Sequence, residues 1–148
     1  MISNSFGLKA DAKNFIHINT LNDLSALLSI DDKPLLILGA GTNVLLSNYF
    51  DGTVIVVRFK DIEINDDFIS VGAGVDWADL IEYCLANRLY GIENLTHIPG
   101  SVGAAPVQNI GASHSKSSTT ILKPLSKNLN CSNFSDSSFK VGFNLLKA

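Results

Sequence analysis

Short apolar runs separated by polar turns fill residues 1–75, and they predict a series of β-strands. Strands are expected at 15–18, 34–38, 44–47 and 53–59, with the turn-like sequence NYFDG (48–52) joining the last two. The run PLLIL at 34–38 is apolar throughout, as expected of a strand that is buried on both faces. The segments 61–65 and 68–74 predict a hairpin that turns at 66–67.

Two further segments show helical periodicity. The first begins at Thr20, a predicted N-cap, and Asp23 follows it near the positive end of the helix. Its apolar face is expected to comprise Leu21, Leu24, Leu27 and Leu28. The second follows Asp76, also a predicted cap, and continues to residue 89. Its buried face is expected to comprise Trp77, Leu80, Ile81, Cys84 and Leu85.

The order of these elements indicates the fold class. In residues 1–112, strands outnumber helices and follow one another directly instead of alternating with helices. This pattern favours an α+β domain over a Rossmann fold. Beyond Ala112 the apolar periodicity is weak, and 9 of the 26 residues from Ser113 to Ser138 are serine. We therefore expect a disordered or partly ordered tail at 113–148.

The charge changes sign at the same boundary. Residues 1–112 hold 6 Lys+Arg and 13 Asp+Glu, a balance of −7, whereas residues 113–148 hold 5 Lys and one Asp, a balance of +4; together they give the net charge of −3. The acidic body argues against a nucleic-acid partner. No run reaches the roughly 20 apolar residues of a membrane span, and the N-terminus lacks the pattern of a signal peptide. We expect a soluble, cytoplasmic protein with no membrane partner.

Ionisable side chains form no pattern that predicts a catalytic or metal site. Cys84 and Cys131 lie far apart and belong to no Cys/His cluster, which argues against a zinc site. His17, His97 and His114 have no spacing that would bring them together. Carboxylates are expected at helix caps and on the surface, namely Asp76, Asp79, Glu82 and Glu93. We assign no catalytic residue and no metal.

The sequence GAGTN follows directly after the apolar run PLLIL. Gly39 and Gly41 permit a positive φ and a close approach of the backbone. Successive N–H groups in such a turn can hold an anion, while Thr42 adds a hydroxyl and Asn43 can brace the loop. The alternative is a tight turn between strands. The third glycine of a dinucleotide fingerprint is missing, because Val44 stands there, and no GK[ST] of a P-loop follows.

A second uncharged stretch, HIPGSVGAAPVQNIGA, runs from His97 to Ala112. Its small residues would let the backbone pass close to a flat or extended ligand. Gln108 and Asn109 offer amide donors and acceptors. The alternative is a crossover loop that packs beneath the sheet.

Neither stretch has a cationic side chain nearby. No Lys or Arg occurs between Lys33 and Arg58, or between Arg88 and Lys116. A phosphate held by these loops would therefore be bound by backbone N–H groups and hydroxyls. This suits a permanently held cofactor better than an anion that exchanges rapidly.

Four motifs resemble one enzyme family in their order and spacing: LILGAGTNVLLS, GTVIVVRFKDIEI, VGAGVDWADLIEYC and GIENLTHIPGSVGAAPVQNIGA. With the opening NSFGL, which is similar to the family's NTFG-type start, residues 4–112 resemble the N-terminal half of UDP-N-acetylenolpyruvoylglucosamine reductase, also called UDP-N-acetylmuramate dehydrogenase. The resemblance implies an α+β FAD-binding domain of the vanillyl-alcohol-oxidase (PCMH) type at 1–112, with its first subdomain complete and its second truncated. Residues 113–148 would be a divergent or disordered tail, and the family's C-terminal substrate domain would be absent.

The resemblance also implies a binding site for FAD. The GAGTN loop would hold the pyrophosphate, and the second stretch would line the rest of the cofactor. The residues implied are Gly39, Gly41, Thr42, Asn43, Val44, Pro99, Gly100, Val102, Gly103, Ala104, Ala105, Gln108, Asn109 and Gly111. In the family, NADPH reduces the flavin, which passes hydride to the enolpyruvyl group of a UDP-sugar. The implied partners are therefore FAD, NADPH and a UDP-sugar of peptidoglycan synthesis.

Departures from the family pattern limit what the chain is expected to do alone. Ser113–His114 stand where the family has an aromatic–glycine pair, and Ser135 occupies the position of the Arg in its YRxSxFK motif. The family's proton-donating serine and late glutamate belong to a third domain, beyond Ala148. We expect no turnover from this chain without a complementary C-terminal chain. The alternatives are a non-catalytic flavin-binding module or gene remnant, and a flavin oxidase with covalently attached FAD.

Overall fold

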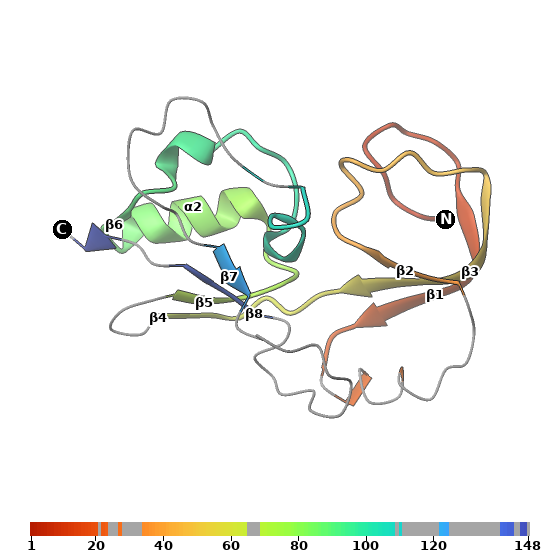
Figure 1. Cartoon of the computed structure of the whole chain (residues 1–148), viewed down its shortest axis with the longest axis horizontal. Coiled ribbons are helices and arrows are strands. Elements are labelled where there is room, and N and C mark those ends of the chain that lie inside the picture. The colour runs from red at the N-terminus through yellow and green to blue at the C-terminus, as the bar shows by residue number, and fades with distance from the viewer. Residues whose placement is uncertain are drawn as a thin grey trace.

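The computed structural model describes residues 1–20, 22–23, 27, 34–64, 69–108 and 110, together with the backbone of 122–124, 140–143 and 146–147. These residues form two lobes that lie along the longest axis of the molecule (Figure 1). The first lobe, residues 1–57, holds a three-stranded sheet. The second lobe begins at residue 62 and packs a helix on a four-stranded sheet. The connector, residues 58–61, joins the two.

The sheet of the first lobe is parallel, with β3 at its centre. Its strands are β1 (Asp11–Ile18), β2 (Leu35–Leu38) and β3 (Tyr49–Val57), in the order β1-β3-β2. Val54 and Ile55 of β3 are buried on opposite faces of the sheet. The expectation that the strand at 34–38 is buried on both faces is wrong, because Ile37 is 72% exposed. β2 is an edge strand that pairs only with β3 among the described residues, and its apolar run is not enclosed.

A loop connects β2 to β3 where we predicted a strand and a turn. Parallel neighbours need a crossover that returns the chain to the starting edge of the sheet, and residues 39–48 provide it. The strand predicted at 44–47 is therefore absent, although Val44 packs against the core of this lobe. The turn predicted at 48–52 is also wrong, since β3 already pairs with β1 from Tyr49 onwards.

The helix start predicted at Thr20 is confirmed by its hydrogen bonds. The N–H of Asp23 donates to Thr20 Oγ1 at 3.3 Å. The Asp23 carboxylate accepts from the N–H groups of Asn19 at 2.8 Å and Thr20 at 2.9 Å, and these bonds hold the pKa of the Asp23 carboxyl below its ordinary value. Leu27 packs against the core formed by Ile18 and Ile55. The other residues predicted for this face, Leu21, Leu24 and Leu28, lie outside the described residues.

The helix predicted after Asp76 is α2 (Trp77–Ala86), and Asp76 is its N-cap residue. The buried residues of α2 are Trp77, Leu80, Ile81 and Cys84, as predicted. Leu85 is an exception, because it is 45% exposed at the border of the buried stripe. The indole Nε1–H of Trp77 donates to the Leu95 carbonyl at 3.1 Å, which ties α2 to the segment that follows it. Within the described ranges, no helix is long and apolar enough to span a membrane.

The second lobe contains the predicted hairpin and receives strands from the tail. Its strands are β4 (Ile62–Ile64), β5 (Ile69–Gly72), β7 (Leu122–Pro124) and β8 (Lys140–Phe143), in the antiparallel order β4-β5-β8-β7, and β6 (Leu89–Tyr90) pairs with β9 (Leu146–Lys147). The predicted turn at 66–67 lies outside the described residues. Three short strands thus lie in the tail, where we expected disorder or partial order. The open edge of β5 provides the backbone groups with which β8 pairs. The domain boundary near 112 stays a prediction.

Two 3₁₀ turns, η1 (Glu93–Leu95) and η2 (Val102–Ala104), follow β6. Of these, η2 lies on the side of the second lobe that faces the first lobe (Figure 1). Backbone hydrogen bonds fix the connector to both lobes: Arg58 N–H to Ile18 O at 2.8 Å, Gly72 N–H to Asp61 O at 2.8 Å and Gly74 N–H to Phe59 O at 2.9 Å. The architecture is α+β, as the sequence predicted. These backbone hydrogen bonds hold the lobes in one arrangement, with a cavity where they meet.

Candidate functional site

A cavity of about 570 Å³ lies where the two lobes meet. The first lobe contributes the ends of β2 and β3 and the GAGTN loop, and the second lobe contributes the segment around η2. The described residues that line it are Ile37, Leu38, Gly39, Ala40, Gly41, Thr42, Asn43, Val44, Val57, Ala73, Ser101, Gly103, Ala104, Pro106, Val107 and Gln108. The two uncharged stretches of the sequence therefore meet at one cavity, whose size suits a small organic ligand.

Most of the predicted site residues are brought together here. Those that line the cavity are Gly39, Gly41, Thr42, Asn43, Val44, Gly103, Ala104 and Gln108. Val102 and Ala105 instead belong to the core of the second lobe. Pro99 and Gly100 lie next to Thr42 but do not line the cavity. Asn109 and Gly111 lie outside the described residues. The role of each residue in binding stays a prediction.

Sequence reasoning did not single out seven of the lining residues, namely Ile37, Leu38, Ala40, Val57, Ala73, Pro106 and Val107. Ser101 lies within 99–105, a range expected to line the cofactor, and it does line the cavity. Ala40, Pro106 and Val107 lie within the two glycine-rich stretches, so their place in these stretches is the signal that could have indicated them. Ile37 and Val57 come from β2 and β3, which are parallel and therefore end at the same edge of the sheet. That the carboxyl ends of these strands face the cavity follows from the fold and not from the local sequence.

The two glycines of the GAGTN loop are required for different reasons. A Cβ at Gly39 would lie 2.9 Å from both the Ala104 Cβ and the Ser101 Oγ of the second lobe, so its absence lets the lobes meet. Gly41 has a φ of +70°, and a Cβ there would lie 2.5 Å from the Ser3 carbonyl oxygen. The loop is thus enclosed by the second lobe on one side and by the N-terminal segment on another.

Polar groups of the two lobes approach one another beside the cavity. The Thr42 hydroxyl donates to the Pro99 carbonyl at 3.5 Å, a long hydrogen bond between the lobes. A Cβ at Gly100 would lie 3.3 Å from Gln108 Nε2 and 3.6 Å from Thr42 Oγ1. The Gln108 Nε2 atom is buried and finds no acceptor among the described residues. Leaving such a donor unpaired costs about 1–3 kcal/mol, so an acceptor from a ligand or from a water molecule would stabilise this position.

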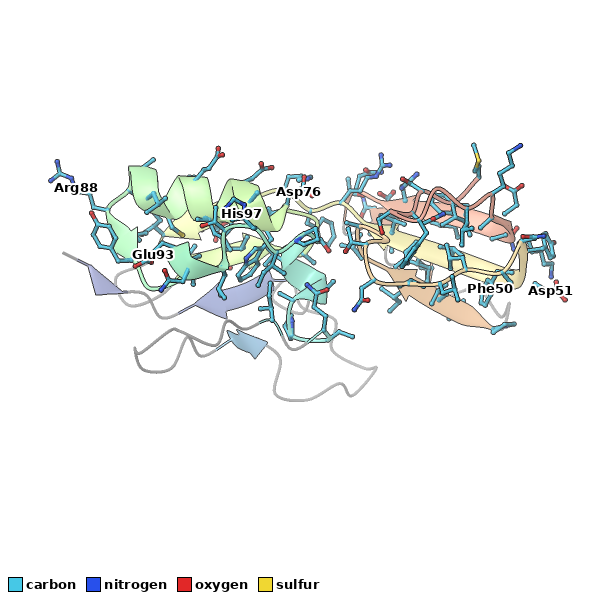
Figure 2. All side chains as sticks on the ribbon, turned by 90° about the horizontal axis from the view of Figure 1, so that it is seen from above. Phe50, Asp51, Asp76, Arg88, Glu93 and His97 are labelled. Atoms are coloured by element: carbon cyan, nitrogen blue, oxygen red, sulfur yellow. The ribbon has the colours of Figure 1, made fainter. Side chains whose placement is uncertain are left out.

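The cavity is electrically neutral in its described lining. None of the described lining residues is ionisable. Figure 2 shows Asp51 and Arg88 at opposite ends of the molecule, far from the junction of the lobes. Asp76 lies closer, but its carboxylate pairs with the Lys60 ammonium at 3.2 Å. An anion in this cavity would therefore meet peptide N–H groups, hydroxyls and amides, and the described lining offers no general acid or base.

The sequence matches a known protein family over most of its length. Residues 15–123 match the family described as FAD binding domain. The chain belongs to this FAD-binding family. Its fold is therefore the PCMH type that the resemblance implied. The match continues past Ala112, where we expected the resemblance to end.

Curated relatives of this FAD-binding chain carry one name. Those named UDP-N-acetylenolpyruvoylglucosamine reductase include proteins of Shewanella sediminis, 45% identical over 116 residues, and of Photorhabdus laumondii, 43% identical over 116 residues. The protein of Escherichia coli K12 with this name is 43% identical over 119 residues. Each match covers 74% of this chain and 34% of the relative. The chain thus spans about a third of the length of the curated relatives that it matches.

The cavity fits the cofactor of the FAD-binding family on three observations. The glycine loop presents successive peptide groups in a turn with a left-handed residue, which is a geometry that binds anions. The buried Gln108 amide has a donor without an acceptor. Ile37 and Val107, which are 72% and 88% exposed, provide apolar surface that a bound ring system would cover.

Proposed function

We propose that this chain binds FAD between its two lobes and is the FAD-binding part of a UDP-N-acetylenolpyruvoylglucosamine reductase, an enzyme of peptidoglycan synthesis. The observation that carries the proposal is the convergence of both glycine-rich stretches on one neutral cavity with an unpaired Gln108 amide. The names of relatives at 39–45% identity support the choice of reaction.

The residues have distinct roles in this proposal. The peptide N–H groups of the GAGTN loop hold the FAD pyrophosphate, and the Gln108 amide donates to an acceptor of the cofactor. Ile37 and Val107 exclude water from the ring that covers them. When bound, FAD supplies hydride transfer, with NADPH as the donor and the enolpyruvyl group of a UDP-sugar as the acceptor, as in the family that the sequence resembles.

Proton transfer has to come from outside the described cavity. Reduction of an enolpyruvyl group places negative charge next to a carboxylate, and that charge needs a proton donor and electrostatic stabilisation. The described lining contains neither an acidic nor a cationic side chain. In this proposal the chain supplies cofactor binding, and turnover requires a proton donor and a stabilising charge that the described lining does not contain.

The same neutral lining favours a second candidate, a flavin-binding module without catalysis. Both candidates bind FAD, and they differ in turnover. NADPH oxidation that depends on the enolpyruvyl UDP-sugar, measured with the chain and again with the C-terminal two-thirds of a relative added, separates them. Turnover that appears only in the mixture supports the reductase, whereas its absence in both supports the module.

Binding of FAD is tested by titrating the full chain with the cofactor. The visible spectrum, flavin fluorescence and thermal denaturation are recorded for the wild type, for Gln108→Leu and for Asn94→Leu, an exposed position outside the cavity. Because Gln108→Leu removes one or two hydrogen bonds to the ligand, the Kd for FAD should rise about three- to thirtyfold. Asn94→Leu should leave the Kd unchanged. The proposal is wrong if the wild type shows neither a spectral change nor an FAD-dependent rise in melting temperature.

Gln108→Leu should not destabilise the protein without FAD. Its Nε2 atom has no acceptor in the described structure, so the substitution relieves an unpaired donor instead of breaking a bond. Thermal denaturation of the two proteins without ligand checks this. A loss of affinity together with an unchanged melting temperature assigns the Gln108 amide to the ligand.

A further inference from the structure

Residues 2–8, which we name the N-terminal clip, form a short closed segment against the GAGTN loop. Ile2 is buried in the core of the first lobe, and its N–H donates to the Ala10 carbonyl at 2.7 Å. Asn4 closes the segment on itself, since its Nδ2 donates to the Leu8 carbonyl at 2.8 Å and its Oδ1 accepts from the Leu8 N–H at 3.1 Å. The clip is therefore held at its base and across its own ends.

Ser5 forms two hydrogen bonds from the clip to the loop. Its N–H donates to the Gly41 carbonyl at 3.1 Å, and its hydroxyl donates to the Thr42 carbonyl at 2.9 Å. Gly41 also approaches the clip closely, because a Cβ there would lie 2.5 Å from the Ser3 carbonyl oxygen. Two successive carbonyls of the loop are thus held toward the same residue.

The direction of these carbonyls sets the direction of the N–H groups that follow them. In a trans peptide, the C=O of one residue and the N–H of the next point in opposite directions. The N–H groups of Thr42 and Asn43 consequently point away from the clip. Both residues line the cavity, whereas no residue of the clip does. Neither N–H donates to a backbone acceptor within the described ranges.

We propose that Ser5 is a positioning residue for the cofactor. By holding the Gly41 and Thr42 carbonyls, it directs the N–H groups of Thr42 and Asn43 together toward the diphosphate of FAD. Ser5 does not touch the ligand and acts through the loop. The identity of the ligand rests on the proposed function, but the contact between Ser5 and the loop exists without any ligand.

The contact is tested first on the full chain without FAD. The heteronuclear NOE of the Thr42 and Asn43 amides is measured by NMR for the wild type, Ser5→Ala, Ser5→Thr and Ser3→Ala. Ser5→Ala should lower the NOE at both amides, because one of the two carbonyls loses its partner, and Ser5→Thr should restore it by returning a hydroxyl. Ser3→Ala is the matched control, since Ser3 meets Gly41 through its backbone carbonyl. Wild-type values in Ser5→Ala would overturn the proposal.

The consequence for binding is tested with FAD and with inorganic pyrophosphate, which probes the diphosphate alone. The Kd of Ser5→Ala should rise about two- to tenfold for both ligands, while Ser5→Thr and Ser3→Ala stay within about twofold of the wild type. If the wild type binds FAD and Ser5→Ala binds it equally well, the positioning role is wrong and the proposed function stands. If the wild type does not bind FAD, the proposed function fails, and the NOE still decides whether Ser5 holds the loop.

Discussion

Gly41→Ala should destabilise the protein more than Gly7→Ala, although the two glycines share a left-handed backbone. Their φ angles are +70° and +66°. An alanine forced into this conformation costs about 1–2 kcal/mol, and the cost is common to both positions. Any difference between the two variants therefore reports the surroundings of the added methyl group and not the backbone strain.

The surroundings differ sharply. A Cβ at Gly7 has nothing within 4 Å, whereas a Cβ at Gly41 would lie 2.5 Å from the Ser3 carbonyl oxygen and 3.2 Å from the Asn4 Cα. Carbon and oxygen that are not bonded approach to about 3.3 Å, so the Ser3 peptide would have to move by roughly 0.8 Å. This peptide is backbone, and the clip anchors it on both sides. Overpacking of this kind costs about 1–3 kcal/mol, which makes the expected total about 2–5 kcal/mol for Gly41→Ala and about 1–2 kcal/mol for Gly7→Ala.

Urea unfolding followed by circular dichroism gives the free energy of unfolding of each variant. Gly41→Ala should in addition weaken FAD binding, because relief of the clash moves the clip that orients the loop. Gly7→Ala adds backbone strain within the clip but no clash with the loop, so it should weaken FAD binding less than Gly41→Ala. Equal losses of stability in the two variants would show that the clip does not pack against Gly41, and would remove the basis for a role of Ser5.

Two further predictions concern pH. Burial raises the pKa of the Cys84 thiol to about 11, so in a Cys131→Ser background Cys84 should react with a thiol reagent only as fast as the protein unfolds. Because the folded thiol keeps its proton to a higher pH than the unfolded thiol, the free energy of unfolding should fall as the pH rises from 9.0 toward about 11. This fall should be smaller in Cys84→Ala. Desolvation, with a smaller contribution from the charge of Arg58, lowers the pKa of His17 below its ordinary value of 6.5. The unfolded chain therefore binds the proton more readily, and the free energy of unfolding should fall as the pH drops below 6.5. If the wild type and His17→Asn showed the same slope of unfolding free energy against pH, this prediction would be wrong.

Elements whose signals are local could be predicted from the sequence. The apolar stripe of α2 lies within one helix, and the start at Thr20 is made by hydrogen bonds between neighbours in the chain. The burial of β2 could not be predicted in this way. Its place at the edge of the sheet depends on β3, which is inserted between β1 and β2 although it follows both in the sequence. The crossover that replaces the strand predicted at 44–47 has the same cause, since it exists only because β2 and β3 are parallel.

The composition of the two uncharged stretches was enough to locate the candidate site. It did not predict which contact each glycine makes possible. Both uncharged stretches reach the cavity. Gly39, however, makes room for Ala104 and Ser101, and Gly41 makes room for Ser3. These contacts join segments far apart in the sequence, so the pattern of glycines does not reveal them. In the sequence, the NSFGL segment carries only a resemblance, whereas in the structure Ser5 of this segment forms a hydrogen bond to the loop.

The described lining of the cavity has no ionisable side chain, so binding there depends on backbone groups, and this links binding to folding. A hydrogen bond to the preceding carbonyl restricts the direction of an N–H group in the GAGTN loop, because the two lie in one planar peptide. For Thr42 and Asn43 that partner is Ser5, whose hydroxyl bonds to a residue 37 positions later in the chain. Substitutions that loosen the clip should therefore weaken the binding of an anion that the substituted residues do not contact. Conversely, a ligand that binds the ordered loop stabilises the folded first lobe by mass action. At saturating FAD, the stabilisation in Ser5→Ala should therefore fall by RT times the logarithm of its rise in Kd, which lowers the thermal shift caused by FAD.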